Sequence, residues 1–318
     1  MLTAFFPFGP HSAVPLFPLV GRLPSILRRP LMNYRHAFHA GNFADVVKHA
    51  VLARVVAHLR EKDSAFRIID THAGSGLTRL SGREASRTGE WRQGIGRLLA
   101  APLDPEIRGL LAPYLEAIAR YNPGGRLLAY PGSPLLALSW LRPQDRLIAC
   151  ELVPAAAARL ARAFGKDRRA KVITIDGWTA LAAYVPPKER RGLVLVDPPF
   201  EAPGEFDRLA DHLARAHRKW ATGTYLLWYP IKDVAETERF ARNIAGLGIA
   251  KILRAEVGIA VPQDKSLAGK SLIGSGLLLV NPPWRLETEL QSLLPALAGV
   301  LRRDRQGAAR LDWLAAEK

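Results

Sequence analysis

The segment Leu193-Val-Leu-Val-Asp-Pro-Pro-Phe200 decides the fold of this 318-residue chain. Its four apolar residues predict a strand buried on both faces, as in a parallel sheet. Asp197 follows at the carboxyl end of the strand, where open α/β sheets place their ligands. Two prolines then fix φ and remove two backbone donors, and Phe200 adds an aromatic ring. The segment therefore predicts an α/β fold with a polar site at this strand end.

This cluster suits an exocyclic amine on a flat heterocycle. Asp197 and the carbonyl of Pro198 would accept the two amine hydrogens, while Phe200 would stack on the ring. The alternative is a strand that simply ends in a rigid turn, and an Asp-Pro-Pro segment alone does not separate the two. The aromatic residue and the rest of the chain favour the amine site.

The composition indicates a globular protein that binds a polyanion. Hydrophobic residues make up 48% of the chain, and the length fits one large α/β domain with an insertion, or two small ones. The formal net charge is +16, and the excess is largely arginine, the better phosphate-binding side chain. The single cysteine, Cys150, allows no disulfide within the chain, which favours a cytoplasmic protein. No uncharged apolar run reaches the roughly 20 residues that span a bilayer.

Residues 1–31 differ from the rest, since they are rich in proline and contain three arginines but no acidic residue. The arginines come too late for a signal peptide, and the prolines disfavour an amphipathic membrane anchor. We predict a poorly ordered extension, with Met32 as an alternative start. A chain that begins at Met32 should therefore match the full chain in melting temperature and turnover. A large loss in either would show that the extension contacts the domain or its substrate.

The next segment predicts a helix that begins near Gly41 or Asn42 and ends at about Arg60, because apolar residues recur along one side. Its neighbourhood holds three histidines within fourteen residues, at positions 36, 39 and 49. No cysteine or nearby carboxylate completes a zinc set, so we expect no metal. A histidine here is better suited to hydrogen bonding or stacking beside a nucleotide pocket.

Acidic residues close several predicted strands. The predicted strands at 66–70, 147–150 and 172–175 precede or contain Asp70, Glu151 and Asp176. Because parallel strands end at the same edge of a sheet, these acids and Asp197 should line one site. The loop Thr71-His-Ala-Gly-Ser-Gly76 allows close approach of backbone amides to a ligand, although it lacks the full dinucleotide fingerprint.

Residues 77–125 are polar and predict a helical insertion that supplies a basic surface beside the pocket, although a solvated helical face is the alternative. The arginines of its first half are Arg79, Arg83, Arg87, Arg92 and Arg97. Residues 129–134 predict a turn that opens a helix. Later strands are expected at 223–230, 251–258 and 276–280, the final two antiparallel. Asn281-Pro-Pro-Trp284 repeats the opening motif without a carboxylate, so it is the weaker amine site.

Together these motifs resemble the RlmJ family of 23S rRNA adenine-N6 methyltransferases, from Met32 to beyond Trp284. The strings that carry the resemblance are Tyr34-Arg-His-Ala-Phe-His-Ala-Gly-Asn42, Lys48-His49, Asp70-Thr-His-Ala-Gly74, Tyr130-Pro-Gly-Ser-Pro134, Asp176-Gly177, Asp197-Pro-Pro-Phe200 and Leu227-Trp-Tyr-Pro230. Two departures are a phenylalanine at 200, where the family often has tyrosine, and residues 1–31, which have no counterpart.

The resemblance implies a Rossmann-like class I S-adenosylmethionine-dependent methyltransferase domain over residues 32–318, with the small helical insertion at about 77–125. By this resemblance the cofactor-binding residues are His49, His72, Ser133, Glu151, Asp176 and Gly177. Asp197 is the implied catalytic acceptor and Tyr34 touches the RNA, while Pro198 and Phe200 complete the adenine pocket. The implied partner is 23S rRNA, protein-free or in an early assembly intermediate, and a monomer that binds no membrane is expected.

Two other functions are open at this stage. DNA adenine-N6 methyltransferases use the same Asp-Pro-Pro-aromatic chemistry, but the surrounding strings argue against that class. A non-catalytic RNA-binding Rossmann-like module, or a fold acting on a nicotinamide cofactor, is the third possibility. Retention of Asp197 with the Gly74–Gly76 loop disfavours an inactive enzyme, and the missing fingerprint disfavours a dehydrogenase.

Overall fold

The computed structural model describes Met1 and residues 38–260, 272–303 and 307–316. The chain divides into two units, Met1–Asn33 and Tyr34–Lys318, and only the second is considered below. The predictions for the extension therefore lie outside the described residues, apart from Met1, and so does the predicted RNA contact of Tyr34.

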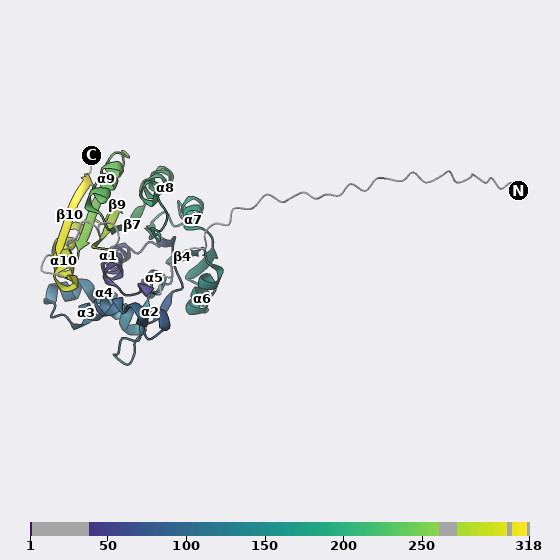
Figure 1. Ribbon diagram of the computed structural model, residues 1–318. Coiled ribbons are helices and arrows are strands. Elements are labelled where there is room, and N and C mark those ends of the chain that lie inside the picture. Colours follow the sequence, from purple (N-terminus) through teal and green to yellow (C-terminus); the bar gives the residue numbers. More distant parts are fainter. Residues whose placement is uncertain (2–37, 261–271, 304–306, 317–318) are drawn as a thin grey trace, which may run out of the picture. The chain divides into compact units, whose positions relative to one another are not determined.

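An eight-stranded sheet forms the centre of this unit (Figure 1). Its strand order is β10-β8-β9-β7-β6-β1-β4-β5. The strands are β1 (Arg67–Asp70), β4 (Arg146–Glu151), β5 (Ala170–Thr174), β6 (Gly192–Val196), β7 (Thr224–Ile231), β8 (Ile252–Gly258), β9 (Gly274–Val280) and β10 (Ala308–Ala315). Neighbours among β5, β4, β1, β6 and β7 run parallel, and β9 is antiparallel to both β7 and β8. This arrangement confirms the expected Rossmann-like α/β class.

Helices cover both faces of the sheet, so that β6 is buried along its whole length as its apolar sequence predicts. In Figure 1, α7, α8 and α9 lie on one face, and α1, α4 and α5 lie on the other. The helices are α1 (Phe43–Arg60), α2 (Arg83–Thr88), α3 (Ile95–Ala100), α4 (Pro105–Arg120), α5 (Ser133–Trp140), α6 (Pro154–Phe164), α7 (Gly177–Tyr184), α8 (Glu205–Lys219), α9 (Val234–Ala245) and α10 (Leu286–Leu301), with a short 3-10 helix η2 at Glu90–Arg92.

The first helix, α1, is buried along most of its length and carries part of the site. Asn42 begins it, because its side chain accepts a hydrogen bond from the backbone amide of Asp45 at 3.0 Å. A helix that is buried nearly all round must pair any charge it carries. Lys48 and His49 are both buried in this helix, so the first requires a carboxylate partner.

Two strand predictions need correction. Residues 129–131 form a strand, β3 (Ala129–Pro131), which pairs with β2 (Leu77–Arg79) in a separate two-stranded sheet. The sequence predicted a turn here because the segment is short and its pairing partner lies about 50 residues away. The strand at Gly274–Val280 is also not the last, since β10 follows it. Buried Arg254 holds β10 through a bidentate ion pair with Asp312, at 2.8 and 2.6 Å.

The weaker motif, Asn281-Pro-Pro-Trp284, lies at the opposite end of the sheet from Asp197. It follows β9, which is antiparallel to β7, so its end meets the amino ends of the parallel strands. The amide of Asn281 donates to the carbonyls of Ala221 and Gly223, both at 2.8 Å. This side chain therefore joins β9 to the turn before β7, which argues against an amine site there.

Candidate active site

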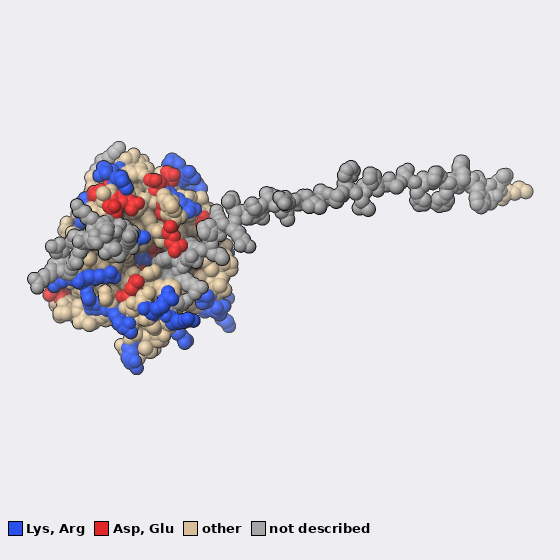
Figure 2. All heavy atoms as spheres, viewed as in Figure 1, with Lys and Arg blue, Asp and Glu red and all other residues tan. Residues whose placement is uncertain are grey.

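The four strand-end acids lie on four neighbouring strands. Asp176, Glu151, Asp70 and Asp197 follow or close β5, β4, β1 and β6, which are adjacent in that order. All four strands are parallel, so the acids share one edge of the sheet. Figure 2 shows acidic groups near the middle of the face viewed, with lysine and arginine gathered below them where Figure 1 places α2, α3 and α4. The tertiary structure thus assembles the predicted edge.

Asp197 is paired with Lys48, a buried lysine of helix α1. The ammonium of Lys48 contacts Oδ2 of Asp197 and lies 2.9 Å from Oδ1 of Asp45. Burial by itself would lower the pKa of Lys48, but the two carboxylates outweigh it and raise the pKa above its ordinary value. Lys48 is therefore a permanent cation. Within the described residues Oδ1 of Asp197 has no hydrogen bond or ion pair, so that oxygen remains available to a ligand.

Two aromatic rings, those of Trp228 and Phe200, lie beside this ion pair. The ring of Trp228 lies edge-on to that of Phe200, with centroids 5.7 Å apart, and the ammonium of Lys48 is 5.9 Å from the Trp228 centroid. Phe200 has a positive φ of 49°, which costs energy for a bulky residue and is typical of functional sites. In the described part of the chain the Pro198 carbonyl accepts no hydrogen bond. The chain thus places two acceptors that no described group uses, Oδ1 of Asp197 and the Pro198 carbonyl, within three residues of the Phe200 ring.

The loop after β1 is closely packed against the ends of β4 and β5. Glu151 accepts hydrogen bonds from the amides of Gly74 at 2.9 Å and Val153 at 2.7 Å. A Cβ on Gly177 would lie 2.4 Å from the carbonyl oxygen of Thr71, so only glycine fits there. Gly74, by contrast, has a positive φ of 65° and open space where a Cβ would point. This open backbone beside a carboxylate can receive a ligand closely.

Asp176 lies at the same edge of the sheet, and only one of its two carboxylate oxygens accepts hydrogen bonds from the described residues. Its Oδ2 accepts from the amide and the hydroxyl of Thr179, at 3.0 and 3.1 Å, and so caps α7. Among the described residues Oδ1 of Asp176 accepts no hydrogen bond. Glu151 can still accept from hydroxyl groups, because each of its oxygens has a second lone pair. These acceptors fit the adenosine part of S-adenosylmethionine, which offers ribose hydroxyls and an exocyclic amine.

The pair Asp70–Ser133 lies beneath this loop. The hydroxyl of Ser133 donates to Oδ2 of Asp70 at 2.6 Å. Burial raises the pKa of Asp70 to about 7, partly opposed by the Ser133 hydrogen bond and reinforced by the charge of Asp197. Asp70 therefore responds to charge brought into the site, because a cationic ligand would favour its ionised form.

The two histidines of the predicted site differ in setting. Burial lowers the pKa of His72 to about 4, so its ring is neutral and bonds the Thr71 hydroxyl at 2.8 Å. Nδ1 of His49 lies 2.7 Å from the hydroxyl of Tyr130, which in turn contacts the hydroxyl of Tyr114 at 2.8 Å. Helix α4 of the predicted insertion thus reaches the site through a buried hydroxyl pair.

Sequence reasoning missed two residues of this site. Lys48 and Trp228 stand in the quoted motifs, yet neither was given a role. The signal for Lys48 was a lysine on an otherwise apolar helix, which requires a buried partner. Trp228 had no comparable signal. No group of three or more metal-ligating side chains suited to a metal ion occurs among the residues that the structure describes.

A comparison with protein families decides the relationship. Residues 63–315 match the family described as "Ribosomal RNA large subunit methyltransferase D, RlmJ". The chain belongs to the RlmJ family. It is 38% identical over 288 residues to ribosomal RNA large subunit methyltransferase J of Haemophilus influenzae, covering 90% of this chain and 100% of that protein. Identity to the Escherichia coli protein of the same name is 38% over 287 residues, with the same coverage.

The three-dimensional comparison agrees with this membership. A crystal structure of a Legionella pneumophila protein is 32% identical with a TM-score of 0.77, and the match covers 86% of this chain and 98% of that one. The family match and the two relatives confirm the RlmJ resemblance expected from the motifs. In the described ranges, none of the helices is both long and apolar enough to cross a membrane.

Proposed function

We propose that this RlmJ-family member transfers a methyl group from S-adenosylmethionine to the exocyclic N6 amine of an adenine in 23S rRNA. The observation that carries the proposal is the strand-end carboxylate of Asp197, with Oδ2 held by Lys48 and Oδ1 available, beside Phe200. The named relatives are rRNA large subunit methyltransferases, and the positive charge of the chain suits RNA.

In this proposal the enzyme acts mainly by positioning the amine. The adenine is turned out of its RNA context and stacks on Phe200. Oδ1 of Asp197 and the Pro198 carbonyl accept the two N6 hydrogens, so that the nitrogen lone pair is less shared with the ring and can be directed at the methyl carbon. The proton that N6 loses passes to Asp197 or to water. Lys48 fixes the carboxylate in the accepting orientation.

S-adenosylmethionine, when bound, supplies the electrophilic methyl group. We propose that Glu151, Asp176 and Gly177 receive its adenosine part, and that Ser133, His49 and His72 complete its site. Support comes from the spare acceptors of Glu151 and Asp176 and from the open backbone at Gly74. Tyr34, which lies outside the described residues, is proposed to touch the RNA. We further propose a monomeric cytoplasmic enzyme that acts on protein-free rRNA or an early assembly intermediate.

Mass mapping of methylated adenines in 23S rRNA from cells with and without the gene tests the function. One N6-methyladenine should be lost without the gene and restored by the intact chain but not by a D197A chain. The purified enzyme should methylate 23S rRNA transcripts far faster than duplex DNA. Equal rates on duplex DNA would instead support the DNA methyltransferase alternative.

Phe200 should be tested as the adenine-stacking surface. Phe200→Ala removes the ring and should lower kcat/KM about 5- to 150-fold, since stacking contributes roughly 1–3 kcal/mol per base. Phe200→Tyr retains the ring and should stay within a few fold of the wild type. Steady-state kinetics on an rRNA transcript would measure both. Equal losses in the two variants would show that the ring does not hold the base.

The arginines of the predicted insertion should contact RNA. Arg87 lies over the Phe38 ring at 4.5 Å and Arg92 over the Trp91 ring at 4.8 Å, so neither is neutralised by these contacts. Replacing Arg83, Arg87 and Arg92 with glutamine should weaken RNA binding and flatten its log–log salt dependence by about 0.7–0.9 per lost phosphate contact. Cofactor affinity should not change. A full salt slope in the triple variant would indicate a solvated face.

A further inference from the structure

The end of the sheet opposite to Asp197 is strongly basic. Four loops precede the parallel strands β1, β4, β5 and β6, at residues 61–66, 141–145, 165–169 and 185–191. These loops contain eight lysines and arginines against five acids, so the excess is positive. The first residues of three strands add further cations, since Arg67, Arg146 and Lys171 belong to β1, β4 and β5. The proposed chemistry at the other edge uses none of these residues.

Several of these cations line a single pocket of about 330 Å³. Its lining includes Arg67, Arg146, Arg168, Arg169 and Lys171, together with Tyr184. Five cationic residues line this pocket, and the resulting positive potential favours an anion over a neutral ligand.

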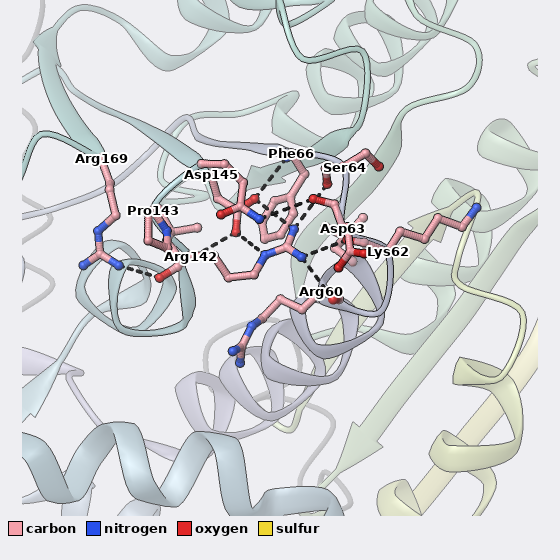
Figure 3. Close-up of polar contacts among 12 residues, drawn as sticks. Arg60, Lys62, Asp63, Ser64, Phe66, Arg142, Pro143, Asp145 and Arg169 are labelled. Carbon is pink, nitrogen blue, oxygen red and sulfur yellow. Dashed lines mark hydrogen bonds and ion pairs between the residues drawn. The ribbon is translucent and has the colours of Figure 1, made fainter.

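Part of this charge serves the fold. Arg67 forms a bidentate pair with Glu189, with both distances 2.7 Å, and Arg169 pairs with Asp167 at 2.6 Å. Figure 3 shows Arg142 at the centre of a network that joins two loops, where it donates to the carbonyls of Lys62 and Ser64 and pairs with Asp145. These arginines hold the loops in place, so folding accounts for them.

The remaining cations are less engaged: Arg146 donates to the carbonyls of Pro143 and Asp145, both at 2.8 Å, but its charge is not paired with any described carboxylate. Within the described residues no carboxylate lies within ion-pair distance of Arg146, Arg168 or Lys171, and the last two are exposed. In Figure 3 the side chains of Arg60 and Lys62 extend away from the Arg142 network. Burial lowers the pKa of Arg191, and the nearby charge of Arg142 lowers it further, so these two guanidinium groups repel each other. Repulsion of this kind costs stability unless an anion relieves it.

We infer that this amino-terminal edge of the sheet is a second RNA-binding surface, where the pocket between Arg146, Arg168 and Lys171 receives backbone phosphates of the same 23S rRNA. The inference rests on the proposed function, since it assigns the surface to that substrate. A strand of six residues such as β4 spans about 20 Å, so the two edges are separated by roughly that length. Only an RNA that extends well beyond the target adenine reaches both.

The test compares a long and a short RNA with one variant and a matched control. The variant is Arg168→Gln with Lys171→Gln, both at exposed positions outside the proposed active site. The control is Arg239→Gln with Arg242→Gln, which removes two charges from exposed positions on α9. Binding and methyl transfer are measured against salt concentration on full-length 23S rRNA transcript and on a hairpin of about 30 nucleotides that contains the modified adenine.

The variant should bind the full transcript about tenfold more weakly at low salt, with a log–log salt slope reduced by about 1.4–1.8 for two lost phosphate contacts. Its kcat and its activity on the hairpin should equal those of the wild type, and the control should change neither. Ultraviolet cross-linking of the wild type should attach RNA to the peptide containing residues 165–171. An unchanged slope on the transcript overturns the inference, and so does equal weakening on the hairpin. Failure of the proposed function would look different, because the wild type itself would not methylate rRNA.

Discussion

Replacing Asp197 with alanine should lower the single-turnover rate of methyl transfer at least 100-fold, while the dissociation constant of S-adenosylmethionine stays within a few fold. The large loss is expected because Oδ1 of this carboxylate is the side-chain acceptor proposed to orient the N6 amine, and positioned acid–base groups typically contribute 10²–10⁴-fold. The proposed cofactor-binding acids, Glu151 and Asp176, lie at the ends of other strands, so cofactor affinity should persist. Single-turnover assays with a labelled methyl group measure the rate directly.

Asp197→Asn is the matched control for shape. It keeps an oxygen acceptor but removes the charge that pairs with Lys48, so it should retain more activity than D197A and still fall well below the wild type. Activity of D197A above about one hundredth of the wild type would contradict the positioning role. Loss of cofactor binding in both variants would instead indicate a disturbed sheet edge.

Replacing Lys48 with methionine should cost both stability and activity. The side chain is only 5% exposed and pairs with two carboxylates, so its removal leaves the Asp45 and Asp197 charges close together without a cation. Breaking a buried pair in this way costs about 3–5 kcal/mol, which corresponds to a fall in melting temperature of roughly 10 °C. Methyl transfer should fall as well, measured at a temperature where the variant is folded, since Asp197 loses its orientation.

Two comparison variants separate these effects. Lys62→Met removes an exposed lysine in the loop that follows the same helix and should change the free energy of unfolding by less than about 0.5 kcal/mol. Adding Asp45→Asn to Lys48→Met removes one of the two carboxylates that have lost their cation. The double variant should therefore regain part of the stability but little of the activity. If the double variant regained full turnover, the Lys48–Asp197 contact would not be needed for positioning.

Much of the fold followed from local sequence patterns. The buried run before Asp197, the capping of α1 by Asn42 and the acids that close β1 and β4 each have a local physical cause, such as periodicity, capping geometry or residue burial. The series of strand-end acids could also be predicted to meet, because parallel strands share one carboxyl edge. The structure has the Asn42 cap of α1 and places the strands that carry these acids side by side.

The elements that depended on distant partners were missed. Strand β3 forms only because β2, about 50 residues earlier, provides its hydrogen-bonding partners. The last strand, β10, is held by a buried ion pair between Arg254 and Asp312, and neither residue signals a strand alone. Pairing across such separations depends on loop closure and burial, which short patterns do not encode.

The sequence by itself determined the Rossmann-like class, the acids at the carboxyl ends of the strands and the Asp-Pro-Pro-Phe motif, because each strand and its closing residues are neighbours in the chain. Only the tertiary structure decided that Lys48, 149 residues before Asp197, holds its carboxylate, and that Trp228 lies beside Phe200. It also decided that four separate loops combine into one basic edge. The physical reason is that charge pairing and ring contact act through space, and packing of α1 against the sheet sets those distances.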